Sequence, residues 1–252
     1  MTTMTGDFTV DGYRALLVAL FERGYKAHSF TDARPERRHL ILRHDLDMSL
    51  EAALPLAEVE RSLGVRAAYF VLVRSEFYNP FTAAARATLD AIRGLGHEVG
   101  LHFDANLYPA DRSALDKAAA QECALLQAGL GIEVRTISLH RPGKVFLGME
   151  GRLAGRLHTY APRFFQSMGY CSDSRGAWQR GHPLSHTAVA EGRGLHLLTH
   201  PIWWTGRPEE TVKARLDRFA RQRFDLLREE LARNCEPYRD SMRVPSLEDE
   251  SR

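Results

Sequence analysis

Two aspartates one residue apart end an apolar segment in the first fifth of the chain. Residues 39–47 read His-Leu-Ile-Leu-Arg-His-Asp-Leu-Asp, and an apolar run without helical spacing is typical of a buried strand. Alternate residues of a strand share a face, so Asp45 and Asp47 point the same way and His44 points to the other side. Two such carboxylates repel unless a proton or a metal lies between them, so one could hold a metal while the other takes a proton from water. Exposed strand-end acids, or caps of a helix beginning at Met48, would give the same pattern.

Other Asp and His residues follow other predicted strands. The strands are predicted at 39–47, 66–73, 97–104, 134–140, near Tyr170, and 195–200. The residues that end or follow these strands are Asp45 and Asp47, His102 and Asp104, His140, Asp173, and His200. The C-terminal ends of strands form the site in parallel α/β sheets and barrels, so five such ends predict one shared active site.

The elements between these strands read as helices. They are predicted at 11–23, 50–63, from after Pro80 to 94–96, from after Asp111 to 129, and around 153–168. Alternating strands and helices indicate a parallel sheet with crossover helices, and we expect an α/β fold with one closed or partly closed (β/α) barrel. We divide the chain into a lead-in with a helix (1–36), the barrel core (37–206), and a C-terminal amphipathic helix and tail packed on the barrel (207–252).

Composition is that of an ordinary globular protein. The 252 residues are 44% hydrophobic and 26% charged, and the net charge of +2 gives no reason to expect nucleic acid or an anionic membrane as a partner. Three widely spaced cysteines indicate reduced thiols, and neither a signal peptide nor a membrane span is predicted. We therefore expect a cytoplasmic protein, while the oligomeric state is not indicated by the sequence.

In order and spacing, these motifs resemble the NodB-like polysaccharide deacetylases, carbohydrate esterase family four. The resemblance covers about 39–204, and the motifs that carry it are Asp45 with Asp47, GHEVGLHFDAN at 96–106, HRPG at 140–143, SDSRGAW at 172–178, and Leu198-Thr199-His200. It implies a distorted (β/α) barrel of the NodB-homology type in a single domain. It also implies Asp45 as the catalytic base, His200 as the acid, and Asp47 with His102 as metal ligands.

The sequence departs from the family pattern at the metal site. Leu46 separates the paired acids, which are adjacent in the family, and Asn106 occupies the position of the family's second metal histidine. An amide oxygen is a weak ligand for a zinc-type ion. We predict that His140 supplies the third ligand, with Asn106 or Asp104 as the alternatives.

A second group of residues is predicted to bind substrate. It consists of Arg141, Asp173, Leu198, Trp203 and Tyr78, which lie at or after the ends of strands at the same pole. The resemblance implies one divalent ion, expected to be zinc, that would lower the pKa of a bound water for attack on an amide carbonyl. The predicted function is metal-dependent N-deacetylation of a soluble N-acylated sugar or sugar-containing metabolite. The alternatives are a non-catalytic carbohydrate- or small-molecule-binding barrel and a hydrolase of a non-sugar C–N bond.

Overall fold

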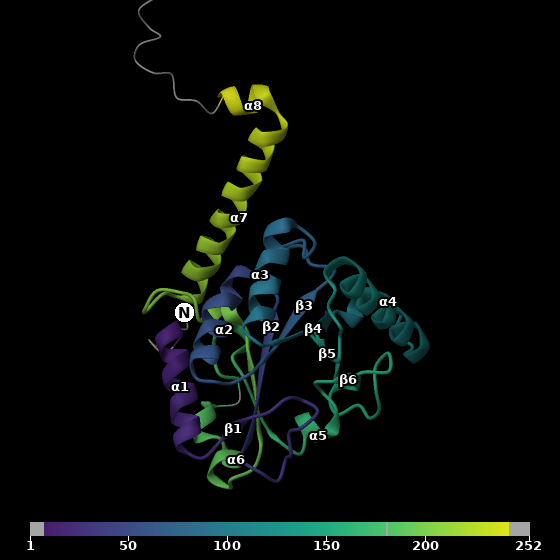
Figure 1. The fold of residues 1–252 in the computed structure, drawn as a ribbon, viewed down its shortest axis with the longest axis vertical. Coiled ribbons are helices and arrows are strands. Elements are labelled where there is room, and N and C mark those ends of the chain that lie inside the picture. Colours follow the sequence, from purple (N-terminus) through teal and green to yellow (C-terminus); the bar gives the residue numbers. More distant parts are fainter. Residues whose placement is uncertain (1–7, 180, 242–252) are drawn as a thin grey trace, which may run out of the picture. The chain divides into compact units, whose positions relative to one another are not determined.

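The structure is a computed structural model that describes residues 8–179 and 181–241. Its strands are β1 Lys26–Ala27, β2 His39–Leu46, β3 Ala68–Leu72, β4 Glu98–Phe103, β5 Thr136–Leu139, β6 Leu157–His158, β7 Gly169–Ser172 and β8 Leu195–Thr199. Its α-helices are α1 Val10–Glu22, α2 Leu54–Ser62, α3 Ala83–Gly94, α4 Arg112–Leu130, α5 Pro162–Phe165, α6 Thr187–Ala190, α7 Val212–Asn234 and α8 Glu236–Ser241. Helices α2, α3 and α4 alternate with β2 to β5 along the chain and lie around the sheet (Figure 1).

All strand pairs between named strands are parallel. The sheet order is β6-β5-β4-β3-β2-β8-β7, with β1 paired beside the start of β2. The two edges face each other across the interior: Tyr160, which follows β6, lies with its hydroxyl 3.3 Å from that of Tyr170 on β7. Arg43 on β2 likewise reaches Ser138 on β5, across two intervening strands. The sheet is therefore curled into a distorted, incompletely closed (β/α) barrel, as predicted.

The interior of the barrel changes from apolar to charged along the strands. A buried cluster of Phe30, Ala33, Ile41, Ala68, Phe70, Phe164 and Met168 fills the part near the strand starts. The ring of Phe70 covers Gly100, where a Cβ would come within 2.8 Å of it. Because alternate residues share a face, Ile41 is followed inside the barrel by Arg43 and Asp45. Apolar packing near the strand starts thus supports a polar site near the strand ends.

A buried polar network on the outer side of the sheet connects the neighbouring strands β2 and β8. His44 Nδ1 lies 2.6 Å from the hydroxyl of Thr199 on β8, and His44 Nε2 lies 2.6 Å from a carboxylate oxygen of Glu60 on α2. Glu60 also accepts hydrogen bonds from the hydroxyls of Tyr13 and Tyr69. His44 therefore points away from Asp45, as predicted, and it connects β2 with β8 and α2.

The predicted helix over 153–168 is wrong. The segment begins with a bridge between Leu153 and Arg156 and continues as β6, and only the four residues of α5 are helical. Gly155 has a φ of +73°, which breaks a helix, and Pro162 lacks the backbone N–H needed inside one and begins α5 instead. The spacing of the apolar residues alone concealed this division.

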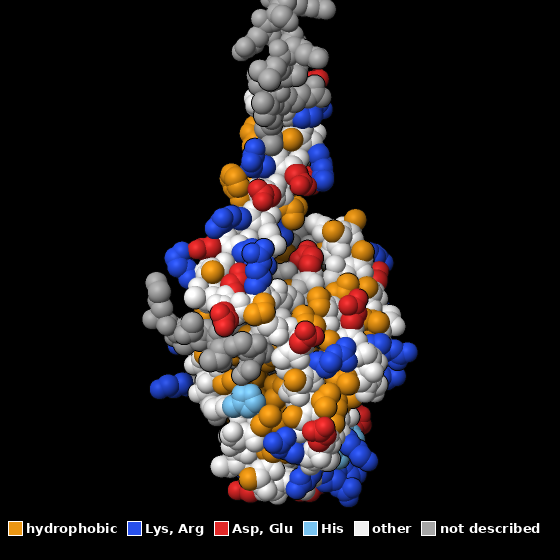
Figure 2. Space-filling model, turned by 90° about the vertical axis from the view of Figure 1, so that its left-hand side faces the viewer, with side chains coloured by type: hydrophobic (Ala, Val, Ile, Leu, Met, Phe, Trp, Pro, Cys, Tyr) orange, Lys and Arg blue, Asp and Glu red, His pale blue; other side chains and the backbone are white. Residues whose placement is uncertain are grey.

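The chain forms two compact units. One lies within Thr3–Glu210 and contains the whole sheet, and the other contains α7 and α8. Helix α7 lies within the region 207–252, where the sequence predicted a C-terminal helix, and the side chain of Thr211 caps its first turn. Residues 242–252 of the predicted tail lie outside the described residues. Basic and acidic side chains are interspersed on the face seen in Figure 2. Among the described residues no helix is long and apolar enough to span a membrane.

Candidate active site and metal cluster

A cavity of about 540 Å³ lies at the C-terminal ends of the strands. Residues that line it include Asp45, Asp47, His102, His140, Leu198 and His200, from the ends of β2, β4, β5 and β8. The sequence predicted this convergence at one pole, and the parallel order of the sheet is its cause, since every one of these strands ends on the same side. The volume is that of an ordinary small-molecule site.

Three of the lining residues bring donor atoms together. His102 Nε2 lies 3.0 Å from Asp47 Oδ1 and 3.1 Å from His140 Nδ1, and His140 Nδ1 lies 3.4 Å from Asp47 Oδ1. These are the one group of at least three His, Cys, Asp or Glu residues with metal-site spacing in the described part of the chain. A tetrahedral ion with ligands at about 2.1 Å keeps its ligand atoms roughly 3.4 Å apart. The cluster therefore fits a small divalent cation with one carboxylate and two imidazole ligands.

One feature of a typical metal-binding histidine is missing. His102 is buried, and its Nδ1 has no hydrogen-bond partner among the described residues. Histidine ligands usually donate their second N–H to a carboxylate or carbonyl.

The charge state of Asp47 is set by its neighbours. Burial raises the pKa of Asp47, but hydrogen bonds with His102 and His140 and the charge of His200 outweigh it and hold that pKa well below the usual range. Asp47 is thus ionised and available as a ligand.

Asp45 is fixed by a buried arginine on its own strand. Arg43 Nε and Nη2 donate to the two carboxylate oxygens of Asp45 at 2.9 and 2.6 Å, and Ser138 Oγ donates to Oδ1 at 2.9 Å. Burial raises the pKa of Asp45, yet the charge of Arg43 outweighs it and lowers that pKa below the usual value. Asp45 Oδ2 also lies 3.7 Å from His102 Nε2, so the ionised carboxylate lies directly beside the candidate metal ligands.

His200 is held on the opposite side by a second buried carboxylate. Its Nδ1 lies 2.6 Å from Asp173 Oδ1, and Trp204 Nε1 donates to Asp173 Oδ2 at 2.7 Å. The other ring nitrogen, Nε2, lies 3.8 Å from Asp47 Oδ2. Burial lowers the pKa of His200, but Asp173 and the acids at the cluster raise it to about 9. His200 is therefore protonated at neutral pH and positioned to give a proton. Asp173, predicted to bind substrate, instead holds His200 and is itself fully buried.

The two alternative ligands are engaged elsewhere. Asn106 Nδ2 donates to Asp104 Oδ1 at 2.9 Å and to the Arg141 carbonyl at 3.3 Å. Asp104 Oδ2 accepts from Arg141 Nη2 at 2.7 Å. The structure thus brings His140 to Asp47 and His102, while Asn106 and Asp104 form a separate group with Arg141.

The remaining predicted substrate residues divide into two kinds. Arg141, Leu198 and Trp203 line the cavity. Tyr78 is not among the residues that line it: the buried hydroxyl donates to the Leu46 carbonyl at 2.6 Å and accepts from the Leu72 N–H at 2.9 Å. Tyr78 therefore joins the ends of β2 and β3.

Two arginines near the site, Arg43 and Arg175, were not predicted as site residues. Arg43 stood within an apolar run, although a buried arginine needs a charge partner and Asp45 lies two residues later on the same strand face. That spacing was the available signal. Arg175 lines the cavity from the short 3-10 turn Ser174–Gly176 after β7, and it lies within the motif at 172–178 although it was not itself predicted as a site residue.

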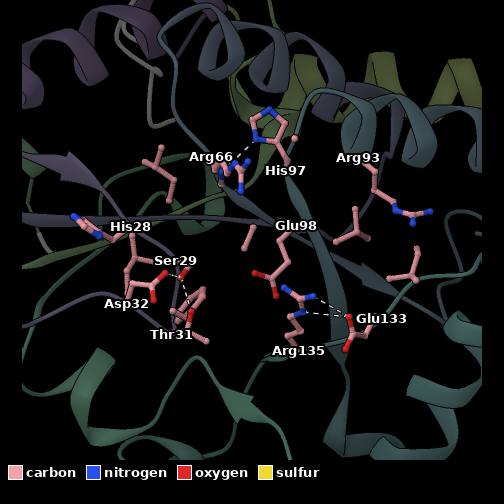
Figure 3. Close-up of a pocket in the computed structure, with 18 of the residues that line it drawn as sticks. His28, Ser29, Thr31, Asp32, Arg66, Arg93, His97, Glu98, Glu133 and Arg135 are labelled. Atoms are coloured by element: carbon pink, nitrogen blue, oxygen red, sulfur yellow. Dashed lines mark hydrogen bonds and ion pairs between the residues drawn. The ribbon is translucent and has the colours of Figure 1, made fainter.

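A larger cavity of about 700 Å³ lies at the opposite end of the strands (Figure 3). Several of its polar side chains bond to one another: Arg135 Nη2 donates to Glu133 at 2.9 Å, Arg93 Nη1 donates to Asp90 at 3.2 Å, and Ser29 Oγ donates to Asp32 at 2.5 Å. None of its lining residues belongs to the group with metal-site spacing among the described residues. The smaller cavity is therefore the candidate active site.

Among known proteins, the chain is similar to solved structures only. No family model and no curated protein matches this chain. The Streptococcus pyogenes deacetylase PplD in complex with acetate is 12% identical, with 82% of this chain and 85% of that chain covered and a TM-score of 0.43. A family 4 acetyl xylan esterase from Clostridium thermocellum in complex with a cobalt ion is 17% identical, with coverage of 73% and 82% and a TM-score of 0.37. A CE4 family pseudoenzyme from Bacillus anthracis is 14% identical, with coverage of 80% and 64% and a TM-score of 0.39. The second of these proteins is named as a family 4 esterase and the third as a CE4 family protein.

Proposed function

We propose that this protein is a metal-dependent N-deacylase that hydrolyses the amide of a soluble N-acylated sugar or sugar-containing metabolite. The observation that carries the proposal is the convergence of Asp47, His102 and His140 with donor atoms 3.0–3.4 Å apart, between an ionised Asp45 and a protonated His200. Asp47, His102 and His140 would hold one divalent ion, expected to be zinc, which when bound supplies Lewis acidity to the reaction.

The side chains of the protein divide the proton transfers between them. Asp45 accepts a proton from the attacking water, whose oxygen adds to the amide carbonyl carbon. His200 donates a proton to the amide nitrogen as the C–N bond breaks, and the products are a carboxylic acid and an amine. Asp173 and Trp204 keep the His200 ring in place for this donation, because they fix Nδ1 and leave Nε2 toward the cluster.

The competing function is a barrel that binds a small molecule without hydrolysing it. It is favoured by one observation: both oxygens of Asp45 already accept hydrogen bonds from Arg43, which makes Asp45 a weak base. The protonated His200 beside the cluster favours the enzyme, since a binding site has no need of a proton donor held by its own buried carboxylate.

Metal analysis with matched variants tests the proposal. We expect about one divalent ion per chain by elemental analysis, loss of amine release after chelation, and its return on adding zinc. His140→Ala should weaken metal binding by tenfold or more, whereas Asn106→Ala, its matched control, should change it little. The opposite ranking would make Asn106 the third ligand. Metal-loaded protein that binds an N-acyl sugar but releases no amine would establish the binding function instead.

A further inference from the structure

The mouth of the candidate active site carries a positive charge without a matching acid. Arg175 lines the cavity, is exposed, and has no hydrogen-bond or ion-pair partner among the described residues. Arg141 lines the same cavity, and its side chain is 71% exposed although Nη2 donates to Asp104. Two arginines therefore remain available to a ligand at one cavity.

The acids at this end of the barrel are already matched by other cations. Asp45 pairs with Arg43, Asp173 with His200, and Asp104 with Arg141. Asp45 and Asp47 are the acids among the residues that line the cavity, and Asp47 faces the histidines of the cluster. A ligand in the cavity would thus meet an uncompensated guanidinium at Arg175.

Both arginines have a backbone conformation that residues with a Cβ rarely adopt. The φ of Arg141 is +44° and that of Arg175 is +64°, and they are two of the four described non-glycine residues with positive φ. The left-handed conformation costs about 1 kcal/mol or more for a residue with a Cβ, and glycine adopts it freely. An arginine at such a position is an unfavourable choice for folding, and strain of this kind is concentrated at functional sites.

We propose that Arg175, together with Arg141, binds an anionic group of the substrate, so that the protein acts on N-acylated sugars that carry a phosphate or a carboxylate. This inference rests on the proposed function, because it places the acyl group at the metal cluster and the anion at the mouth. A guanidinium suits both groups, since its N–H donors form paired hydrogen bonds to two oxygens of one oxyanion.

Steady-state kinetics on matched substrates tests the inference. The neutral substrate is N-acetylglucosamine, the phosphate substrate is its sugar phosphate, and the carboxylate substrate is N-acetylmuramic acid. We expect at least one anionic substrate to have a KM about tenfold to a hundredfold below that of the neutral sugar, the usual value of a hydrogen bond to a charged group. The anionic substrate with the lower KM shows whether the site prefers a phosphate or a carboxylate.

Variants of Arg175 separate this contribution from the rest of the site. Arg175→Ala should raise the KM for the anionic substrate about tenfold or more while kcat, and the KM for the neutral sugar, stay within about twofold. Arg175→Gly should lose the same preference without a lower melting temperature, because glycine removes the backbone strain. Arg37→Ala, an exposed arginine before β2, removes the same charge elsewhere and should leave every constant unchanged.

Binding measured without turnover distinguishes the two proposals. Calorimetric titration of the metal-loaded protein with the sugar phosphate and with N-acetylmuramic acid should show Arg175-dependent binding even if no amine is formed, in which case the hydrolase proposal fails and the anion site stands. Hydrolysis of neutral and anionic sugars with equal KM, unaffected by Arg175→Ala, would overturn the anion site and leave the hydrolase proposal intact. Binding that persists unchanged in Arg175→Ala would also overturn it, because the metal then holds the anion.

Discussion

Asp45, the proposed catalytic base, has an unusual environment. Burial raises its pKa, but the charge of Arg43 outweighs burial and keeps the carboxylate ionised at neutral pH. We predict that Asp45→Asn retains the metal and lowers kcat by about 10²–10⁴-fold, the usual contribution of a positioned base. Amine release is to be measured on protein of known metal content and at a temperature well below its melting point. Loss of the metal would mean that Asp45 is a ligand and that the roles of the two acids are exchanged.

Arg43 and Asp45 also form a buried ion pair with a measurable coupling. Arg43 is fully buried and Asp45 is 2% exposed, so removing the guanidinium leaves a carboxylate without a counter-charge inside the barrel. We predict that Arg43→Met lowers the free energy of unfolding by about 3–5 kcal/mol, and that adding Asp45→Asn to it recovers a substantial part of this loss. Urea unfolding of the wild type, both single variants and the double variant gives the coupling. Additive losses would show that the two side chains stabilise the barrel independently.

At the scale of elements, most of the strands that position the candidate site were predictable from the sequence. Six of the eight strands were predicted, and the Asp and His residues at or after the ends of five of them mark the pole where the candidate site lies. The two strands that the sequence did not reveal, β1 and β6, have two residues each and depend on pairing with β2 and β5. The contact of Arg43 with Ser138 on β5 depends on how far the sheet curls, which no local sequence pattern records.

Strand β8 carries a buried histidine that makes the stability of the barrel depend on pH. His196 is fully buried against Phe30 and Tyr170, and among the described residues only its Nδ1 has a hydrogen-bond partner, the Phe164 carbonyl at 3.2 Å. Burial, followed by the charge of Arg43, lowers the pKa of His196 to about 3. The folded state therefore keeps this ring neutral where an unfolded chain would protonate it.

The sign of the effect follows from proton uptake on unfolding. Between the unfolded pKa of about 6.5 and the folded pKa of about 3, the unfolded chain binds one more proton at His196, so stability is complete above the higher value and falls as pH decreases. We predict that His196→Leu reduces the slope of unfolding free energy in this window by up to about 1.4 kcal/mol per pH unit. Urea unfolding at several pH values measures it. An unchanged slope would assign the acid sensitivity to the carboxylates.

At the scale of the whole molecule, all the residues of the proposed site lie in one of the two compact units. Every residue proposed for metal binding, proton transfer or anion binding lies within Thr3–Glu210, which also contains the complete sheet and the apolar cluster. The other unit contributes α7, whose exposed hydrophobic residues are Phe224, Leu226, Leu227 and Leu231. The site therefore depends on contacts made inside the larger unit.

A truncated chain tests this division. We predict that a protein ending at Glu210 folds cooperatively and binds zinc within about threefold of the full chain's affinity, because all the ligands and the buried pairs that fix them are retained. Circular dichroism during heating reports the folding, and competition with a chelator of known affinity reports the zinc binding. The full chain carrying His140→Ala serves as the reference for a lost ligand. If the truncated protein melts without a cooperative transition, α7 contributes to the folding of the barrel. If it folds and yet binds zinc as weakly as that reference, α7 is required to hold the cluster in place.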